Sequence, residues 1–247
     1  MNNLYIFAGV NGAGKSTFYI NQLENNDFYG ARINSDEIVR EFGDWNNPLD
    51  QNRAGRLAIK LRNSYLKKGI DFNIETTLSG HSIVNFIKQA KKSGYNITLF
   101  YVGLESVELS KQRVAIRVAK KGHGIDDKTL ERRFSQSFEN LAKIIPICDT
   151  IYFYDNSKLI KNQDEQKFSN LIKIAEKKDF NITIYKSIEW FDEMLKSCLN
   201  PNFHFFIDSY FDEIEQVANN RNIKDILFDK NNEIKQNEKP KIKKRLQ

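Results

Sequence analysis

The residues with the clearest chemical potential form one run near the start of the chain, Gly9-Val10-Asn11-Gly12-Ala13-Gly14-Lys15-Ser16-Thr17. Its spacing, Gly-x-x-x-x-Gly-Lys-Ser, is that of a P-loop, in which backbone N–H groups and a helix start cradle phosphate oxygens. We expect Lys15 to reach the β- and γ-phosphates of a nucleotide and the Ser16 hydroxyl to bind Mg²⁺. An apolar strand over 4–7 and a helix over 17–23 are expected on either side. The run therefore predicts a nucleoside triphosphate site.

A carboxylate, Asp36, follows the short strand expected over 30–34. In a phosphoryl-transfer enzyme, an aspartate beside the phosphate site accepts the proton of the attacking hydroxyl. Capping of the next helix by Ser35 or Asp36 explains the same residues equally well. The two roles are compatible, because a cap also fixes the direction of the side chain.

A second carboxylate, Glu75, lies near the end of the strand expected over 72–77 and is followed by Thr76 and Thr77. A charge in a buried strand needs a partner. Glu75 could hold substrate hydroxyls, or hold water on Mg²⁺, and a salt bridge to a neighbouring helix is the structural alternative. The pattern favours the functional role, with Glu75 and Thr76 in a substrate site.

Four arginines occupy two successive expected helices: Arg113 and Arg117 in the first, Arg132 and Arg133 in the second. The first two are four residues apart and share a helix face. Two arginine-bearing helices joined by Gly122-His123-Gly124 predict a lid that neutralises charge during phosphoryl transfer. We assign Arg113 and Arg117 to catalysis and Arg133 to substrate binding. A solvated, salt-bridged helix pair is the alternative. It is the better explanation for any single arginine, whereas a functional role is the better explanation for at least one of the four.

Strand and helix patterns alternate along the chain, which predicts an α/β fold: a parallel sheet with helices on both faces and a helical, arginine-bearing lid. Further strands are expected over 97–102, 151–154 and 181–185, and helices over 37–42, 50–68, 82–93, 106–121, 127–145, 168–177, 188–199 and 204–219. Ligands of such sheets bind at the carboxyl ends of the strands. The P-loop, Asp36 and Glu75 are therefore expected to meet at one edge.

The 247 residues suffice for one large domain with a small addition. We expect a kinase-like domain over 1–199, a short helical appendage over 200–228 and a disordered basic tail over 229–247. Residues 235–247 hold six cations and one anion, which leaves only +1 of the net charge of +6 for the rest. This distribution argues against nucleic-acid binding by the body of the protein.

The chain contains no apolar run of the length that crosses a membrane, and its first residues already belong to a strand, so no leader is expected. The two cysteines, Cys148 and Cys198, form no disulfide or metal pattern. Both features predict a cytoplasmic protein with inert thiols.

Seven stretches together resemble the zeta toxin family, P-loop kinases of toxin–antitoxin systems, and its bacterial relatives described as predicted ABC-type ATPases. These stretches are Gly9–Thr17, Ile33–Asp36, Asn73–Ser79, Arg113–Arg117, Lys121–Gly124, Arg132–Phe134 and Tyr154–Ser157. They lie in the family's order and cover roughly residues 3–157.

The resemblance implies transfer of the γ-phosphate of ATP, with Mg²⁺, to a hydroxyl group. In characterised members of the family the acceptor is the 3′-hydroxyl of UDP-N-acetylglucosamine. By resemblance Asp36 is the catalytic base, Lys15 binds phosphate and Glu75 faces the substrate, while the lid arginines match only as a group. A toxin of this family would have a separate antitoxin protein as its partner.

Two other functions stay open from the sequence. One is a kinase for another acceptor, such as a nucleotide, an antibiotic or an RNA end, and the other is a non-catalytic ATP-binding switch. Residues 200–247 could fold over the acceptor crevice as an inhibitor, or simply form a solubilising end.

Overall fold

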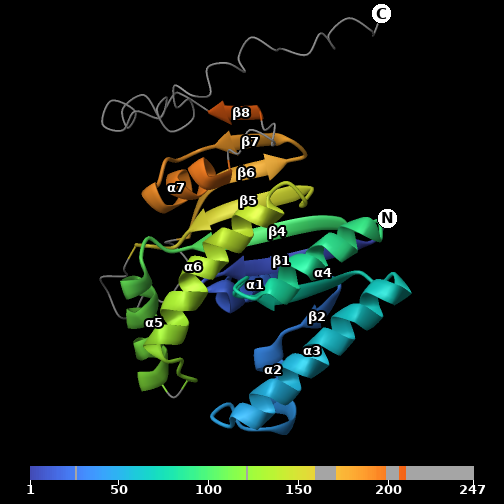
Figure 1. The fold of residues 1–247 in the computed structure, drawn as a ribbon, viewed down its shortest axis with the longest axis vertical. Coiled ribbons are helices and arrows are strands. Elements are labelled where there is room, and N and C mark those ends of the chain that lie inside the picture. Colours follow the sequence, from blue (N-terminus) through green and yellow to red (C-terminus); the bar gives the residue numbers. More distant parts are fainter. Residues whose placement is uncertain (26, 121, 159–170, 199–205, 210–247) are drawn as a thin grey trace, which may run out of the picture.

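The computed structural model describes residues 1–25, 27–120, 122–158, 171–198 and 206–209, and its fold is a sheet with helices on both faces (Figure 1). The strands are β1 Asn3–Gly9, β2 Ala31–Ile33, β3 Phe72–Thr76, β4 Asn96–Gly103, β5 Thr150–Asp155, β6 Ile172–Lys178, β7 Asn181–Ile184 and β8 Phe206–Ser209. The helices are α1 Lys15–Glu24, α2 Ser35–Phe42, α3 Pro48–Lys68, α4 His81–Lys92, α5 Val107–Ala119, α6 Asp127–Ile144 and α7 Glu189–Cys198. No helix in these described ranges is long and apolar enough to cross a bilayer.

The strands lie in the order β2-β3-β1-β4-β5-β6-β7-β8. The first five of these are parallel, as expected, and their carboxyl ends share one edge. The expected parallel sheet is thus present, but the sheet is not parallel throughout, because at the other end β6 runs antiparallel to both β5 and β7. Only two residues, Asp179 and Phe180, connect β6 to β7, and so short a connection permits only an antiparallel pair.

Two expected helices are wrong where the structure describes them. Residues 172–177, expected at the end of a helix over 168–177, belong to strand β6. Residues 206–209, expected inside a helix over 204–219, form strand β8, which pairs in parallel with β7. The rest of both expected helices, and most of the expected appendage and tail, lies outside the described residues.

The two faces of the sheet receive alternate side chains of the central strands. In β1, Ile6 packs into the larger apolar core beneath α3, α4, α6 and α7, whereas Phe7 packs into a smaller, aromatic core with Phe18 of α1. In β4, Tyr101 and Phe100 divide in the same way. Figure 1 shows α4, α6 and α7 over one face of the sheet. Both faces are therefore covered, and the carboxyl ends of the strands carry the site.

Candidate active site

The P-loop leaves the sheet at Gly9, whose backbone has a φ of 145°. A Cβ atom at this position would lie 2.1 Å from the carbonyl oxygen of Val102 in β4, so only glycine fits. Gly14, with a φ of 91°, forms the left-handed N-cap of α1, and Lys15 is the first helical residue. The sequence motif is thus built as the expected strand, loop and helix.

The carbonyl oxygens of the P-loop are held by side chains around it. Lys15 Nζ donates to Val10 O at 3.0 Å, Ser110 Oγ to Asn11 O at 2.7 Å, Arg113 Nη1 to Gly12 O at 3.5 Å and Asn156 Nδ2 to Ala13 O at 2.9 Å. The donors from Ser110, Arg113 and Asn156 come from outside the loop and turn three of these carbonyl oxygens outward. The N–H groups of the same peptide units then face inward, as an anion cradle requires. In the described part of the chain, the buried Asn11 Oδ1 has no hydrogen-bond partner.

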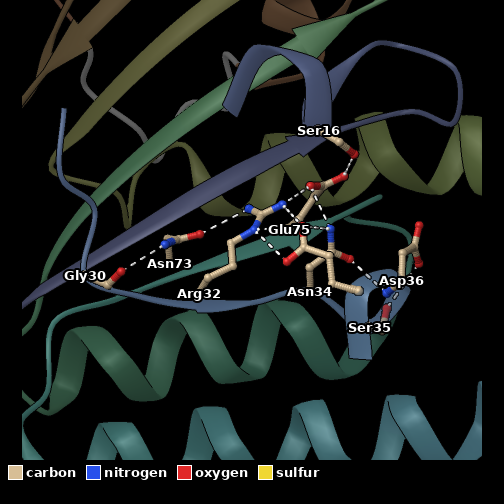
Figure 2. Close-up of polar contacts among 9 residues, drawn as sticks. Ser16, Gly30, Arg32, Asn34, Ser35, Asp36, Asn73 and Glu75 are labelled. Atoms are coloured by element: carbon tan, nitrogen blue, oxygen red, sulfur yellow. Dashed lines mark hydrogen bonds and ion pairs between the residues drawn. The ribbon is translucent and has the colours of Figure 1, made fainter. Parts of the chain in front are cut away.

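Glu75 lies at the centre of a network beside the cradle, as Figure 2 shows. Its Oε1 accepts a hydrogen bond from Ser16 Oγ at 2.5 Å. Its Oε2 accepts from Arg32 Nη2 at 2.5 Å and from Asn34 Nδ2 at 3.0 Å. The side chain of Glu75 is only 8% exposed. The salt bridge considered from the sequence exists, but it joins Glu75 to a strand, β2, and not to a helix.

Arg32 is the cation that balances this buried carboxylate. Its Nη1 donates to Asn73 Oδ1 at 3.1 Å, and its Nη2 also donates to Glu37 Oε1 at 2.9 Å. The guanidinium lies over the ring of Tyr19, 3.7 Å from the centroid. With contacts on every side, Arg32 fixes the orientation of Glu75.

Asn34 caps helix α2, a role that the sequence suggested for Ser35 or Asp36. Its Oδ1 accepts from the backbone N–H of Asp36 at 2.9 Å, while its Nδ2 binds Glu75. One amide therefore positions both candidate carboxylates. The Asp36 side chain is left free of capping and points away from Glu75 (Figure 2).

The surroundings of Asp36 raise its pKa above the ordinary value. Burial is the main cause and repulsion by Glu75 the second, while the positive charges of Lys15 and Arg117 oppose both. The pKa of Lys15 is lowered, chiefly by its burial, although Glu75 and Asp36 favour its charged form. These mutual influences place the two carboxylates and the P-loop lysine in one electrostatic cluster.

Two of the lid arginines belong to this cluster. Arg117 of α5 and Arg133 of α6 have lowered pKa values because both are partly buried, and Asp36 favours the charged form of each. Arg117 Nε donates to the carbonyl oxygen of His123 at 3.1 Å. Its Nη2 is buried without a hydrogen-bond partner in the described residues. A phosphate oxygen would satisfy this donor.

The other two arginines lie elsewhere. Arg113 Nη2 donates to the carbonyl oxygen of Asn156 at 2.5 Å, so this guanidinium supports the back of the P-loop. Arg132 Nη1 donates to Gln136 along the exposed side of α6. Thr76, expected near the substrate, accepts a hydrogen bond from the backbone N–H of Leu78, which has a positive φ. The hydroxyl of Thr76 thus stabilises the turn that follows β3.

The Gly122–Gly124 link is held against the segment between α2 and α3 by an aromatic contact. The ring of His123 stacks on Trp45, with 4.2 Å between centroids and 9° between planes. Its Nε2 lies 3.9 Å from Asp36 Oδ2. Burial and the charges of Arg117, Arg40 and Arg133 lower the pKa of His123 to about 4. The imidazole is therefore neutral at pH 7, and its contact with Asp36 is not an ion pair.

This lowered pKa makes part of the protein's stability depend on pH. The unfolded chain binds a proton at His123 near pH 6.5, whereas the folded chain resists it to about pH 4. Stability is thus present above pH 6.5 and is lost as the pH falls toward 4. The wild type should lose unfolding free energy between pH 7 and pH 4.5, and we expect this loss to be about 2 kcal/mol smaller in His123→Gln.

Urea titrations at both pH values measure the unfolding free energy, and exposed His81→Gln is the control. Equal pH dependence of the unfolding free energy in the wild type and both variants would contradict the prediction.

Asn156 provides a test of the outward-held carbonyls. Asn156→Ala removes the donor to Ala13 O, worth about 1 kcal/mol. We expect ATP to bind about fivefold more weakly, with little change in the unfolding midpoint, because the side chain is only partly buried. Isothermal calorimetry measures the affinity, and Asn85→Ala on the exposed side of α4 is the matched control. Equal affinities in the two variants would exclude this support role.

The residues beside the cradle fit Mg²⁺. The Ser16 hydroxyl and the Glu75 carboxylate meet at 2.5 Å, and both are the hard oxygen groups that Mg²⁺ prefers. Ser16 would bind the ion directly and Glu75 through water. Within the described residues, no group of three or more His, Cys, Asp or Glu side chains could hold a metal by itself, so substrate phosphates would complete the coordination.

Sequence reasoning assigned no role to six residues of this site: Arg32, Asn34, Trp45, Asn73, Ser110 and Asn156. Asn34, Asn73 and Asn156 lie in stretches that resemble the zeta toxin family. Arg32 and Asn34 also carried a local signal. Arg32 is a charge inside an expected strand, and Asn34 is a strong N-cap residue directly before an expected helix. The contacts of Ser110 and Asn156 with the P-loop join residues 99 and 143 positions apart, which no local pattern reveals.

Comparison with known proteins identifies the family. The family model described as zeta toxin matches residues 2–171. An uncharacterized protein of Haemophilus influenzae is 36% identical over 133 residues, which are 54% of this chain and 93% of that protein.

One of three similar solved structures, with a TM-score above 0.5, shows the fold. The AvrRxo1-ORF1:-ORF2 complex with ATP gives a TM-score of 0.57 at 12% identity, over 89% of this chain and 71% of that chain. The PezAT toxin–antitoxin system of Streptococcus pneumoniae gives 0.44 at 18% identity, over 69% and 75% of the two chains. The match to the Pnkp1/Rnl/Hen1 RNA repair complex, with a TM-score of 0.46 at 23% identity, covers 57% of this chain but only 46% of that chain. The chain therefore belongs to the zeta toxin family and has the fold and the P-loop of an ATP-dependent kinase.

Proposed function

We propose that this protein transfers the γ-phosphate of ATP to a hydroxyl group of a small molecule, with Asp36 as the general base. One arrangement carries the proposal: Asn34 holds the backbone of Asp36 and also binds Glu75, and Glu75 accepts a hydrogen bond from Ser16 of the P-loop. The charges of Lys15, Arg117 and Arg133 all act on the Asp36 carboxylate. A structural carboxylate would gain little from this place, because its burial and the neighbouring Glu75 both disfavour its charge.

In the proposed step, Asp36 accepts the proton of the acceptor hydroxyl as its oxygen forms a bond to the γ-phosphorus. The bond between this phosphorus and the β–γ bridging oxygen breaks, and ADP leaves with the electron pair. Lys15 and the buried Nη2 of Arg117, which has no hydrogen-bond partner among the described residues, would stabilise the negative charge of the transferring group. Arg133, on the acceptor side, would bind the substrate.

Mg²⁺ held at Ser16, and through water at Glu75, would neutralise charge on the β- and γ-phosphates. The pairing of Glu75 with Arg32 and Asn34 fixes the carboxylate so that one oxygen faces Ser16. This orientation supports a metal-site role for Glu75 more directly than the contact with substrate hydroxyls suggested by resemblance.

For the acceptor we propose a UDP-linked amino sugar, with the 3′-hydroxyl of UDP-N-acetylglucosamine first, on the basis of membership in the zeta toxin family. On the same basis we propose a cytoplasmic toxin that a separate antitoxin protein restrains. Support comes from the AvrRxo1 structure, which holds ORF1 together with ORF2.

The decisive assay incubates the full chain with ATP, Mg²⁺ and UDP-N-acetylglucosamine and detects a phosphorylated sugar nucleotide by mass spectrometry. We expect product that depends on all three components and that disappears with Lys15→Ala. Transfer to a nucleotide, an aminoglycoside or an RNA 5′-end in parallel reactions, without transfer to any sugar nucleotide, would replace the acceptor and keep the kinase. ATP binding without transfer to any of these acceptors would favour the switch function.

A further inference from the structure

A groove of about 920 Å³ lies between α6, α7 and the turn after β4, outside the cluster of Lys15 and Asp36. Three aromatic side chains, Phe134, Phe138 and Trp190, line it. Phe138 contacts both of the others, at 5.1 Å from Phe134 and 5.5 Å from Trp190 between ring centroids. The groove therefore has an apolar floor whose rings already support one another.

The groove has a strongly acidic rim. Glu105, Glu139, Glu189 and Glu193 all line it, and no lysine, arginine or histidine is among its described lining residues. Glu105, Glu139 and Glu193 take part in none of the ion pairs between described residues. Aromatic rings below carboxylates suit lysine and arginine, whose alkyl stems lie on apolar surface while the charged ends meet carboxylates.

We propose that this groove binds the cationic end of the same chain, the segment from Lys239 to Arg245. This segment reads Lys-Pro-Lys-Ile-Lys-Lys-Arg and carries five cations without an anion. It holds most of the protein's net charge of +6. The charges of the segment and the rim are thus complementary, and the inference does not depend on the proposed kinase function.

The path of the chain brings the segment within reach. Strand β8 ends at Ser209, which pairs with Ile184 of β7, only three residues before Ser187 on the groove wall. The segment 210–238 that follows could span up to about 100 Å when fully extended. The chain thus leaves the sheet beside the groove, with ample length to return to it.

The groove also adjoins the support of the nucleotide cradle. Trp190 packs closely on Gly103: a Cβ atom on Gly103 would lie 2.3 Å from the ring of Trp190. The Nε1 of Trp190 donates a hydrogen bond to Asp155 at 2.9 Å. The next residue, Asn156, holds the carbonyl oxygen of Ala13 in the P-loop. An occupant of the groove therefore contacts a tryptophan that is tied to the back of the P-loop.

A carbodiimide, which joins adjacent carboxylates and lysine amines, tests the proposal on the full chain. We expect amide cross-links from Glu105, Glu139 or Glu193 to Lys239, Lys241, Lys243 or Lys244, detected by peptide mass spectrometry. Their yield should fall severalfold in 1 M salt, where the screening length is about 3 Å. Ser135→Arg, which adds a cation to the groove wall, should lower the yield about tenfold, whereas exposed Ser93→Arg should not.

Three results would overturn the inference. Cross-links of the tail lysines spread equally to Glu24 and Glu41, far from the groove, would show unspecific contact. Cross-links that join ¹⁵N-labelled to unlabelled chains in a mixture would make a second copy the occupant. The third concerns a Trp45→Phe background, where Trp190 is the only tryptophan. The emission wavelength of Trp190 should shift with salt when the tail keeps its five cations. It should not shift when glutamine replaces the five cations. If the wavelength does not shift in either chain, docking is excluded.

Discussion

Replacement of Asp36 by asparagine should lower the rate of phosphate transfer by about 10²–10⁴-fold, the usual cost of losing a general base. ATP should still bind, because the donors that hold the P-loop are untouched. The helix that carries residue 36 should also persist, because Asn34 supplies its cap. Steady-state turnover and calorimetric ATP affinity separate the two effects, since only the first should change.

The pH dependence should identify the group. Burial and Glu75 raise the pKa of Asp36. When the pH is lowered, wild-type turnover should therefore begin to fall while the pH is still above the ordinary aspartate range, because the base becomes protonated. The residual turnover of Asp36→Asn should not show this fall at low pH. At neutral pH the ionised carboxyl opposes folding, since a raised carboxyl pKa contributes stability only at low pH. The variant should therefore unfold at an equal or higher urea concentration than the wild type.

Asp179→Asn is the matched control for this experiment. It removes an exposed carboxylate at a positive φ that asparagine adopts equally well, far from the P-loop. Its turnover should equal that of the wild type. Transfer by Asp36→Asn at a rate close to that of this control would remove Asp36 from the role of base.

Replacement of Arg32 by methionine should cause the largest loss of stability. Arg32 is the cation paired with Glu75, and their side chains are only 15% and 8% exposed. Leaving one member of a buried pair without its partner costs about 3–5 kcal/mol. The change also removes the contact of the guanidinium with the ring of Tyr19. Urea unfolding at pH 7 measures the loss.

A double variant separates the charge from the packing. In Arg32→Met with Glu75→Gln, no unpaired charge is left behind, so the double variant should recover part of the stability lost by Arg32→Met alone. Exposed Arg56→Met controls for the loss of a surface cation. An Arg32→Met chain as stable as Arg56→Met would show that the buried pair adds nothing.

The sequence identified the residues with chemical roles better than the side chains that hold these residues and the P-loop in place. The P-loop carries its own spacing rule, and Asp36 and Glu75 stand out because a carboxylate at a strand end needs an explanation. Lys15, Asp36 and Glu75 indeed form one cluster. The side chains that hold them, such as Asn156, come from distant parts of the chain, and only the folded structure brings them together.

The fold was predictable where strands alternate with well-patterned helices. The prediction failed where a charged residue is buried in a strand. Strand β6 contains Lys177, which is 2% exposed and donates to the carbonyl oxygen of Cys148. A lysine normally marks a surface position, so Lys177 weakens the strand pattern of a stretch that was expected to be a helix over 168–177. A register shift opposite Phe153 and Tyr154 further disturbs the alternation that identifies a strand. For β8, pairing with β7 is a long-range contact that local spacing cannot encode.

The three carbonyl oxygens of the P-loop that are held from outside the loop have a kinetic consequence. Because side chains from α5 and from the residue after β5 fasten the loop before any nucleotide arrives, binding needs little ordering of the backbone. Association with ATP should then be a single fast phase whose rate rises linearly with ATP concentration. The slower motion in each catalytic cycle would belong to Lys15, which must release the carbonyl oxygen of Val10 before its ammonium group can meet a phosphate.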